Sequence, residues 1–116
     1  MVADPIESAA AYLFQAARNG DQGIPLPNDI IPADADAAYQ VQDRLQAMWI
    51  DAGAGPIAGW KVALTSKVMQ ELLSVARPCE GAIFASRIHQ GEVTMRHGDF
   101  VNIGVETEIA VRIAHD

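Results

Sequence analysis

The sequence is short of cysteine, of basic residues and of long apolar runs. Its one cysteine, Cys79, cannot form an internal disulfide, which points to a reducing compartment, and we expect a cytoplasmic protein. The 8 Lys and Arg residues are outnumbered by 15 Asp and Glu residues, so the formal net charge is −7. That balance argues against binding to nucleic acid or to an anionic membrane, since both contacts need a basic surface. No stretch approaches the roughly 18 apolar residues of a membrane span.

Apolar residues are plentiful and make up 50% of the 116 residues. A chain of this length and composition can bury a core without disulfides or a structural metal. Helical periodicity dominates the first half and strand-like alternation the second, which indicates an α+β fold. We therefore divide the chain into an N-terminal helical region, 1–55, and the first part of a β-rich domain, 56–116.

Two helices are expected in the first region. Asp4 stands before a proline and an apolar stripe, which predicts a helix over 5–19 with Asp4 as its cap. The glycines and prolines of 20–33 predict an extended loop. A second apolar stripe predicts a helix over about 34–52, with Gly53 just beyond its end.

The second region alternates in the manner of β-structure. Strands are predicted over 57–63, 82–88, 92–96 and 101–114. The last of these has the clearest pattern, because apolar side chains occupy one face and mostly polar or small ones the other. Between the first two strands, Thr65 or Ser66 could cap a short helix that ends near Ser74.

Glu106 and Glu108 are the most informative pair in the last predicted strand. Residues two apart in a strand project to the same face, about 6.6 Å from each other. Two carboxylates so placed repel unless a positive charge lies between them, and a hard divalent cation such as Mg²⁺ or Mn²⁺ takes oxygen ligands. The alternative is a solvated strand face with two exposed glutamates.

Lys61 lies inside the apolar strand predicted over 57–63. An ammonium flanked by bulky side chains could be partly desolvated and act as a proton donor or an electrostatic anchor. The alternative is a lysine that reaches from the strand to solvent. The backbone amides near Thr65 and Ser66, at a predicted helix start, could bind a carboxylate or could simply begin the helix.

Three segments carry a resemblance to a known family: 59–66 (GWKVALTS), 78–84 (PCEGAIF) and 105–110 (VETEIA). Together they resemble the 2-keto-4-pentenoate hydratase / 2-oxo-3-hexenedioate decarboxylase family of the fumarylacetoacetate hydrolase superfamily. The match covers about 35–114, in order and at suitable spacings. The combination of G-x-K-x-x-L-T-S with E-x-E about 45 residues later is fairly specific.

The resemblance implies N-terminal helices followed by the start of a mixed β-roll that holds the active site. Members bind Mg²⁺ or Mn²⁺ through three carboxylates, two of which correspond to Glu106 and Glu108, and the third is expected beyond residue 116. Members are about twice this length and form homo-oligomers. We therefore expect the N-terminal half of such a protein, with little activity of its own.

The implied activity is that of a carbon–oxygen lyase, a metal-dependent hydratase in the catabolism of aromatic compounds. The small-molecule substrate is a 2-oxo acid, a short 2-hydroxydienoate or 2-oxoenoate, to which water is added. Lys61 would donate a proton or stabilise charge near the 2-oxygen. The backbone amides of Leu64, Thr65 and Ser66 would hold the substrate carboxylate.

Two alternatives remain open from the sequence. A 2-oxo-3-hexenedioate-type decarboxylase needs an extra cation for the second carboxylate of its substrate, and no spare one is obvious. A non-catalytic degenerate or truncated paralogue would fit the departures from the family pattern. Ala63 replaces a frequent glycine, and Cys79 stands where several members have an Asp acid/base. The neighbouring Glu80 would point to the opposite face of a strand, so one proton-transfer step is open.

Overall fold

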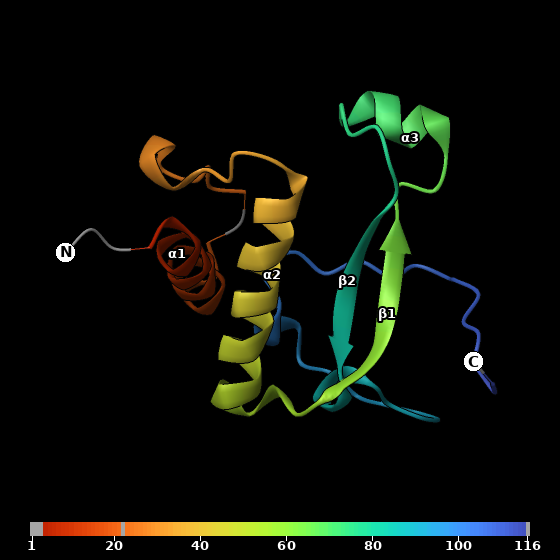
Figure 1. Ribbon diagram of the computed structural model, residues 1–116. Coiled ribbons are helices and arrows are strands. Elements are labelled where there is room, and N and C mark those ends of the chain that lie inside the picture. The colour runs from red at the N-terminus through yellow and green to blue at the C-terminus, as the bar shows by residue number, and fades with distance from the viewer. Residues whose placement is uncertain (1–3, 22, 116) are drawn as a thin grey trace.

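The computed structural model describes residues 4–21 and 23–115, which form two helices, a two-stranded sheet and a short third helix (Figure 1). The elements in chain order are α1 (Pro5–Asn19), α2 (Ala35–Trp49), β1 (Ile57–Ala63), α3 (Lys67–Leu72) and β2 (Cys79–Phe84). Short 3-10 turns lie at Asn28–Ile30, Ala85–Arg87 and His97–Asp99. The predicted α+β class is confirmed. None of the helices in the described part of the chain is long and apolar enough to span a membrane.

α1 begins and ends where its sequence predicts. An Asp4 carboxylate oxygen accepts a hydrogen bond from the Ile6 N–H at 3.0 Å, so it satisfies one of the amides that the first turn leaves without a partner. At the other end Gly20 has φ +79°, a left-handed conformation that glycine adopts without steric cost. Its N–H turns back to the carbonyls of the last turn and closes the helix.

α2 is capped by Asp34, whose carboxylate accepts from the Ala37 N–H at 2.8 Å. The regular helix ends at Trp49, three residues before the predicted end at Ala52. The chain continues through one wide π-type turn, Ile50–Ala54, in which Gly53 has φ +95°. Gly53, predicted just beyond the end of the helix, instead lies inside this wide turn, which ends at Ala54 with Gly55 as its cap.

The core lies between α1 and α2. Ala9 and Ala10 are fully buried and Val41 of α2 is 3% exposed. Alanine side chains let the two helix backbones approach closely. Half-buried apolar residues surround this contact: Ile6, Leu13, Leu26, Ile30, Leu45 and Met48.

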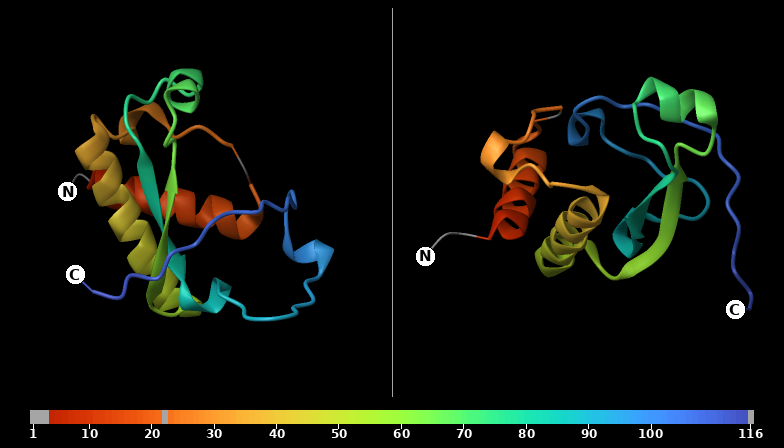
Figure 2. Two further views of the ribbon diagram at one scale, coloured as in Figure 1. Left: turned by 90° about the vertical axis from the view of Figure 1, so that its right-hand side faces the viewer. Right: turned by 45° about the horizontal axis from the view of Figure 1, so that its top comes forward.

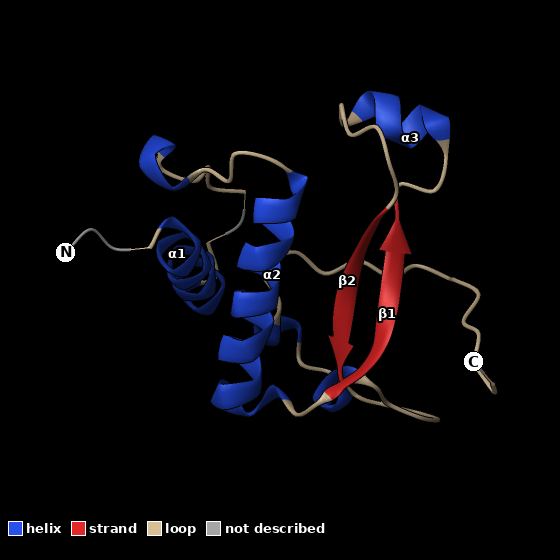
Figure 3. Cartoon of the chain, viewed as in Figure 1, coloured by secondary structure: helices blue, strands red, loops and turns tan. Residues whose placement is uncertain are grey.

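β1 and β2 pair antiparallel, with Lys61 opposite Gly81 and Ala63 opposite Cys79. The helix pair lies on one side of this hairpin, with α2 next to it (Figure 3). Two side chains of α2 bind the backbone of β2 at Glu80. The Gln42 amide donates to the Glu80 carbonyl at 3.2 Å, and the Tyr39 hydroxyl accepts from the Glu80 N–H at 3.4 Å.

Three of the four strand predictions need correction. β2 begins at Cys79, before the predicted 82–88, and it ends at Phe84, where a 3-10 turn takes over. Residues 92–96 form no strand. Residues 101–114 lie beside the hairpin (Figure 2) but pair with no strand in the described part of the chain. Alternation indicates which side chains share a face, whereas a strand also needs a neighbour for its backbone hydrogen bonds.

The apolar side chains of this last segment are correspondingly bare. Val105 is 94% exposed and Ile109 is 96% exposed. Val111 and Ile113 are also largely exposed. Within the described residues, the segment thus presents unpaired backbone and an uncovered apolar edge to solvent.

Candidate active site

The structure brings Lys61 of β1 together with both glutamates of the 101–115 segment, which we call the carboxylate pair (Glu106 and Glu108). The Lys61 ammonium lies 3.5 Å from Glu106 Oε2 and donates a hydrogen bond to Glu108 Oε1. Lys61 and Glu108 are 47 positions apart in the sequence. Three of the residues predicted for the site are therefore neighbours in space.

The pairing of β1 with β2 explains why the lysine can reach this position. Partners directly across an antiparallel ladder project to the same face. Lys61 stands opposite Gly81, and a Cβ added to Gly81 would meet no atom within 4 Å. The space beside the lysine side chain is consequently open, and the chain extends without a cross-strand clash.

The three charged side chains are only partly covered. The exposed fraction is 47% for Lys61, 77% for Glu106 and 56% for Glu108. The hydrogen bond that the Lys61 ammonium donates to Glu108 raises the pKa of the lysine; desolvation opposes this, and the charges of Glu108 and Glu106 add to it. The lysine is therefore a charged ion-pair partner that is half exposed, which lies between the partly desolvated ammonium and the solvent-directed lysine that the sequence left open.

Two clefts adjoin Lys61. One, of about 690 Å³, is lined by Lys61, the carboxylate pair, Gly104 and Val105. The other, of about 740 Å³, lies between β1 and residues 108–112 and is lined by Trp60, Lys61 and Arg112 among others. Ligand sites commonly measure about 300–1,000 Å³. Both clefts have that size, and Lys61 and Glu108 line both of them.

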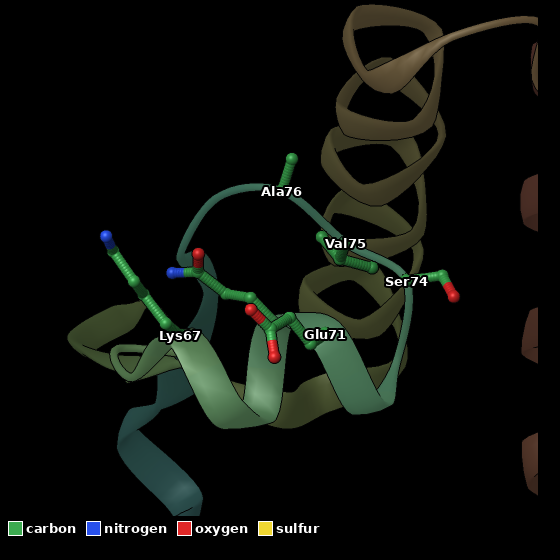
Figure 4. Close-up of a pocket in the computed structure, with 6 residues that line it drawn as sticks. Lys67, Glu71, Ser74, Val75 and Ala76 are labelled. Atoms are coloured by element: carbon green, nitrogen blue, oxygen red, sulfur yellow. The ribbon is translucent and has the colours of Figure 1, made fainter.

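A separate cavity of about 370 Å³ lies at α3 (Figure 4). Its lining residues are Lys67, Gln70, Glu71, Ser74, Val75 and Ala76. None of them belongs to either cleft beside Lys61, and none was predicted from the sequence to be a site residue.

Residues 64–66 form the turn between β1 and α3. The Ser66 hydroxyl accepts from the Met69 N–H at 3.3 Å, so of the two predicted caps the structure uses Ser66. Leu64 has φ +57°, which is uncommon for a residue with a branched side chain, and its carbonyl accepts from the Gln70 amide at 2.8 Å. Gln70 thereby holds this turn, a role that the sequence pattern did not indicate.

The turn lies past the end of β1 from Lys61. Leu64, Thr65 and Ser66 line neither of the two clefts that adjoin the lysine. Among the described residues, the backbone N–H groups of Thr65 and Ser66 donate no hydrogen bond. They are thus free for a ligand, but their role in carboxylate binding stays a prediction.

Cys79 and Glu80 occupy opposite faces of β2. Cys79 pairs with Ala63 and so shares the face of Lys61, whereas Glu80 pairs with Val62 on the other face. The register therefore agrees with the expectation that Glu80 cannot replace an acid/base group at position 79. Cys79 is half-buried and forms no disulfide, and its thiol lies 3.9 Å from the Arg77 carbonyl oxygen.

The carboxylate pair fits part of a divalent cation site. Its carboxylate oxygens already converge on one positive charge, the Lys61 ammonium, and carboxylates are the ligands that Mg²⁺ and Mn²⁺ prefer. Within residues 4–21 and 23–115, no group of three or more His, Cys, Asp or Glu side chains gathers closely enough to hold a metal. The carboxylate pair can supply two ligands, and the coordination shell of the cation would need others to be complete.

Comparison with known proteins identifies the relatives of this chain. It is 34% identical over 111 residues to 2-keto-4-pentenoate hydratase 1 of Dechloromonas aromatica, covering 95% of this chain and 41% of that protein. It is 32% identical over 111 residues to the TodF product hydratase of Pseudomonas putida, covering 96% and 41%. It is 35% identical over 114 residues to a 2-keto-4-pentenoate hydratase of Paraburkholderia phymatum, covering 96% and 42%.

These matches extend over nearly the whole chain but over only about two fifths of each relative's length. No model of a protein family matches the sequence. No solved structure matches it either. The coverage is consistent with the expected N-terminal half of a longer protein. From these relatives, the chain belongs to the 2-keto-4-pentenoate hydratase family.

Proposed function

We propose that this chain supplies part of the active site of a metal-dependent hydratase that adds water to a short 2-hydroxydienoate or 2-oxoenoate. The observation that carries the proposal is the convergence of Lys61 with Glu106 and Glu108 beside two open clefts. The names of the relatives support the reaction class, a hydratase. Its place in the catabolism of aromatic compounds is part of the proposal.

In this proposal Glu106 and Glu108 hold a Mg²⁺ or Mn²⁺ ion together with ligands outside the described residues. When bound, the ion would supply Lewis-acid chemistry, which stabilises negative charge developing on the substrate's 2-oxygen. The two carboxylates contribute the charge and the hard oxygen ligands that this requires.

Lys61 is the proposed proton donor. Its ammonium is charged, half exposed and lines both clefts, so a substrate in either cleft can approach it. A positioned acid must lie within hydrogen-bond reach of the atom that it protonates. The amides of Leu64, Thr65 and Ser66 would hold the substrate carboxylate, which requires the substrate to extend past the end of β1.

A decarboxylase acting on a dicarboxylate of the 2-oxo-3-hexenedioate type is the second candidate, and one observation favours it. Arg112 lines the same cleft as Lys61 and Glu108. The sequence pattern alone had suggested no spare cation for a second substrate carboxylate. A guanidinium at this place is suited to bind one, because it forms bidentate hydrogen bonds with carboxylates.

A turnover assay of the full-length gene product decides between these reactions. 2-Hydroxypenta-2,4-dienoate and 2-oxo-3-hexenedioate would be supplied side by side, with and without Mg²⁺. Mg²⁺-dependent consumption of the dienoate supports the hydratase, and CO₂ release from the dicarboxylate supports the decarboxylase. Turnover of neither substrate would favour the non-catalytic paralogue.

A further inference from the structure

Lys61 takes the position between Glu106 and Glu108 that an electrostatic argument assigns to a cation. It lies 3.5 Å from one carboxylate and donates to the other. Within residues 4–21 and 23–115, no other basic side chain forms an ion pair with either glutamate. The charge of the carboxylate pair is thus partly neutralised by the chain itself.

We propose that Lys61 is the resident counter-ion of the carboxylate pair and that it competes with a divalent cation for the two glutamates. The inference rests on the proposed function only in taking Glu106 and Glu108 as cation ligands. It adds a second role to Lys61: the lysine sets how tightly the site binds its ion, apart from any proton that it donates.

The competition follows from the hydrogen bond that Lys61 makes. The Glu108 oxygen that accepts from the ammonium has one of its two lone pairs in use, so a cation that ligates this oxygen would share it with the donor and lie within a few ångströms of its positive charge. A divalent ion and an ammonium at neighbouring oxygens also repel each other. The lysine has room to leave, since it lines two open clefts.

Displacement of the ammonium couples cation binding to proton donation, in the order that catalysis needs. With no cation bound, the ammonium stays on the carboxylates and is not free to act on a substrate. When the cation takes the carboxylates, the ammonium loses its partners and moves to the cleft side, where a substrate oxygen can accept from it. The lysine is therefore released as an acid only when the site is loaded.

The opposite role for Lys61 is also physically possible, and it predicts the opposite change in cation affinity. Lys61 could hold the two carboxylates together and so prepare them for the cation, since like charges two residues apart on an extended segment otherwise separate. Removing its charge would then weaken cation binding. Under competition, removing the charge strengthens it. The direction of a single affinity change distinguishes the two.

The experiment measures Mn²⁺ binding to the protein by counting free Mn²⁺ with electron paramagnetic resonance. Lys61→Met removes the charge and keeps most of the side-chain length, and Lys61→Arg keeps the charge. Lys67→Met is the matched control, because Lys67 is the other lysine of the chain and lines only the cavity at α3.

We expect Lys61→Met to bind Mn²⁺ about tenfold more tightly, an order of magnitude from Coulomb's law near a surface. Lys61→Arg and Lys67→Met should bind as the wild type does.

Equal or weaker Mn²⁺ binding by Lys61→Met would overturn the competition. Absence of Mn²⁺ binding in every variant would overturn the metal site, and with it the competition. A measurement without metal separates these failures. The ¹³C resonances of the Glu106 and Glu108 carboxyls should shift in Lys61→Met if the lysine is their counter-ion, and unchanged resonances would refute that role whether or not metal binds.

Discussion

Lys61 and Glu108 form a hydrogen-bonded ion pair between β1 and a segment that has no backbone pairing of its own in the described residues. The pair changes the electrostatics expected for an empty site. From their spacing, Glu106 and Glu108 should repel each other, yet a positive charge from the chain lies against both. Removing one carboxylate would therefore mainly cost the ion pair with Lys61, and would relieve little repulsion between Glu106 and Glu108.

Replacing Lys61 by alanine tests its proposed acid role. In the full-length protein we expect turnover to fall by on the order of 10²-fold or more, the usual scale for losing a positioned acid. Metal binding should survive, because an ammonium is not a metal ligand, and it should become tighter if Lys61 competes with the cation for the two glutamates. Steady-state kinetics with saturating Mg²⁺ measures the change. Turnover close to that of the wild type would return Lys61 to a solvent-directed lysine.

Replacing Glu106 or Glu108 by glutamine keeps the size of the side chain and removes its charge. Each change should weaken Mg²⁺ binding and abolish metal-dependent turnover, while the fold persists. Calorimetric titration with Mg²⁺ and a circular dichroism spectrum test both halves of this expectation. Because the side chains are largely exposed, we expect little change in the thermal midpoint of the metal-free protein. Undiminished Mg²⁺ affinity in both variants would show that Glu106 and Glu108 are not ligands of the cation.

The contact between α1 and α2 depends on small side chains. Ala10 is fully buried, so Ala10→Leu should overpack the interface and lower the free energy of unfolding by about 1–3 kcal/mol. The neighbouring Ala11 is exposed, which makes Ala11→Leu a matched control with nearly the same helix propensity. Urea unfolding of the two variants measures the difference. Equal midpoints would show that the helices are not packed as described.

Gln42 and Tyr39 attach α2 to β2 through the backbone of Glu80. Loss of one such hydrogen bond in Gln42→Ala should destabilise the protein by about 1 kcal/mol. The exposed Gln40 on the same helix is the control, and Gln40→Ala should have little effect. Amide hydrogen exchange adds a local readout, since the hairpin should exchange faster in Gln42→Ala. An unchanged exchange rate would show that Gln42 does not stabilise the attachment of α2 to β2.

Residues 101–115 should promote self-association of the chain as described. Val105 and Ile109 are almost fully exposed on an unpaired extended segment, and such segments add to other chains. Replacing both by lysine should reduce the sedimentation coefficient toward that of a monomer. Thr107→Lys adds charge to the same face without removing a large apolar side chain and should reduce association less. A monodisperse wild-type monomer at all concentrations would contradict the expectation.

Local signals were sufficient for the helices and for the first strand. Asp4 and Gly20 bound α1 through contacts within one turn of the helix, so their effect is visible in the sequence itself. The same holds for Ser66 at α3. In each case the cap and the group that it binds are at most four residues apart.

The strands after β1 could not be predicted in this way. Cys79 joins β2 because Ala63 lies across the ladder from it, and nothing near position 79 carries that information. The alternation of 101–114 is as regular as that of any strand, but no neighbour pairs with it in the described part of the chain. Arg112 shows the same effect at the site, since only the approach of the segment to β1 brings it into a cleft with Lys61.

The sequence by itself determined the helical first half, the α+β class, the family and the identity of the candidate site residues. These depend on short-range periodicity, on capping and on the order of motifs, which a linear pattern records. Only the tertiary structure decided that Lys61 is the counter-ion of Glu106 and Glu108, and that Gln42 and Tyr39 hold β2. Charges and hydrogen bonds act over a few ångströms in space, so partners about 40 residues apart become visible only when folding has brought them together.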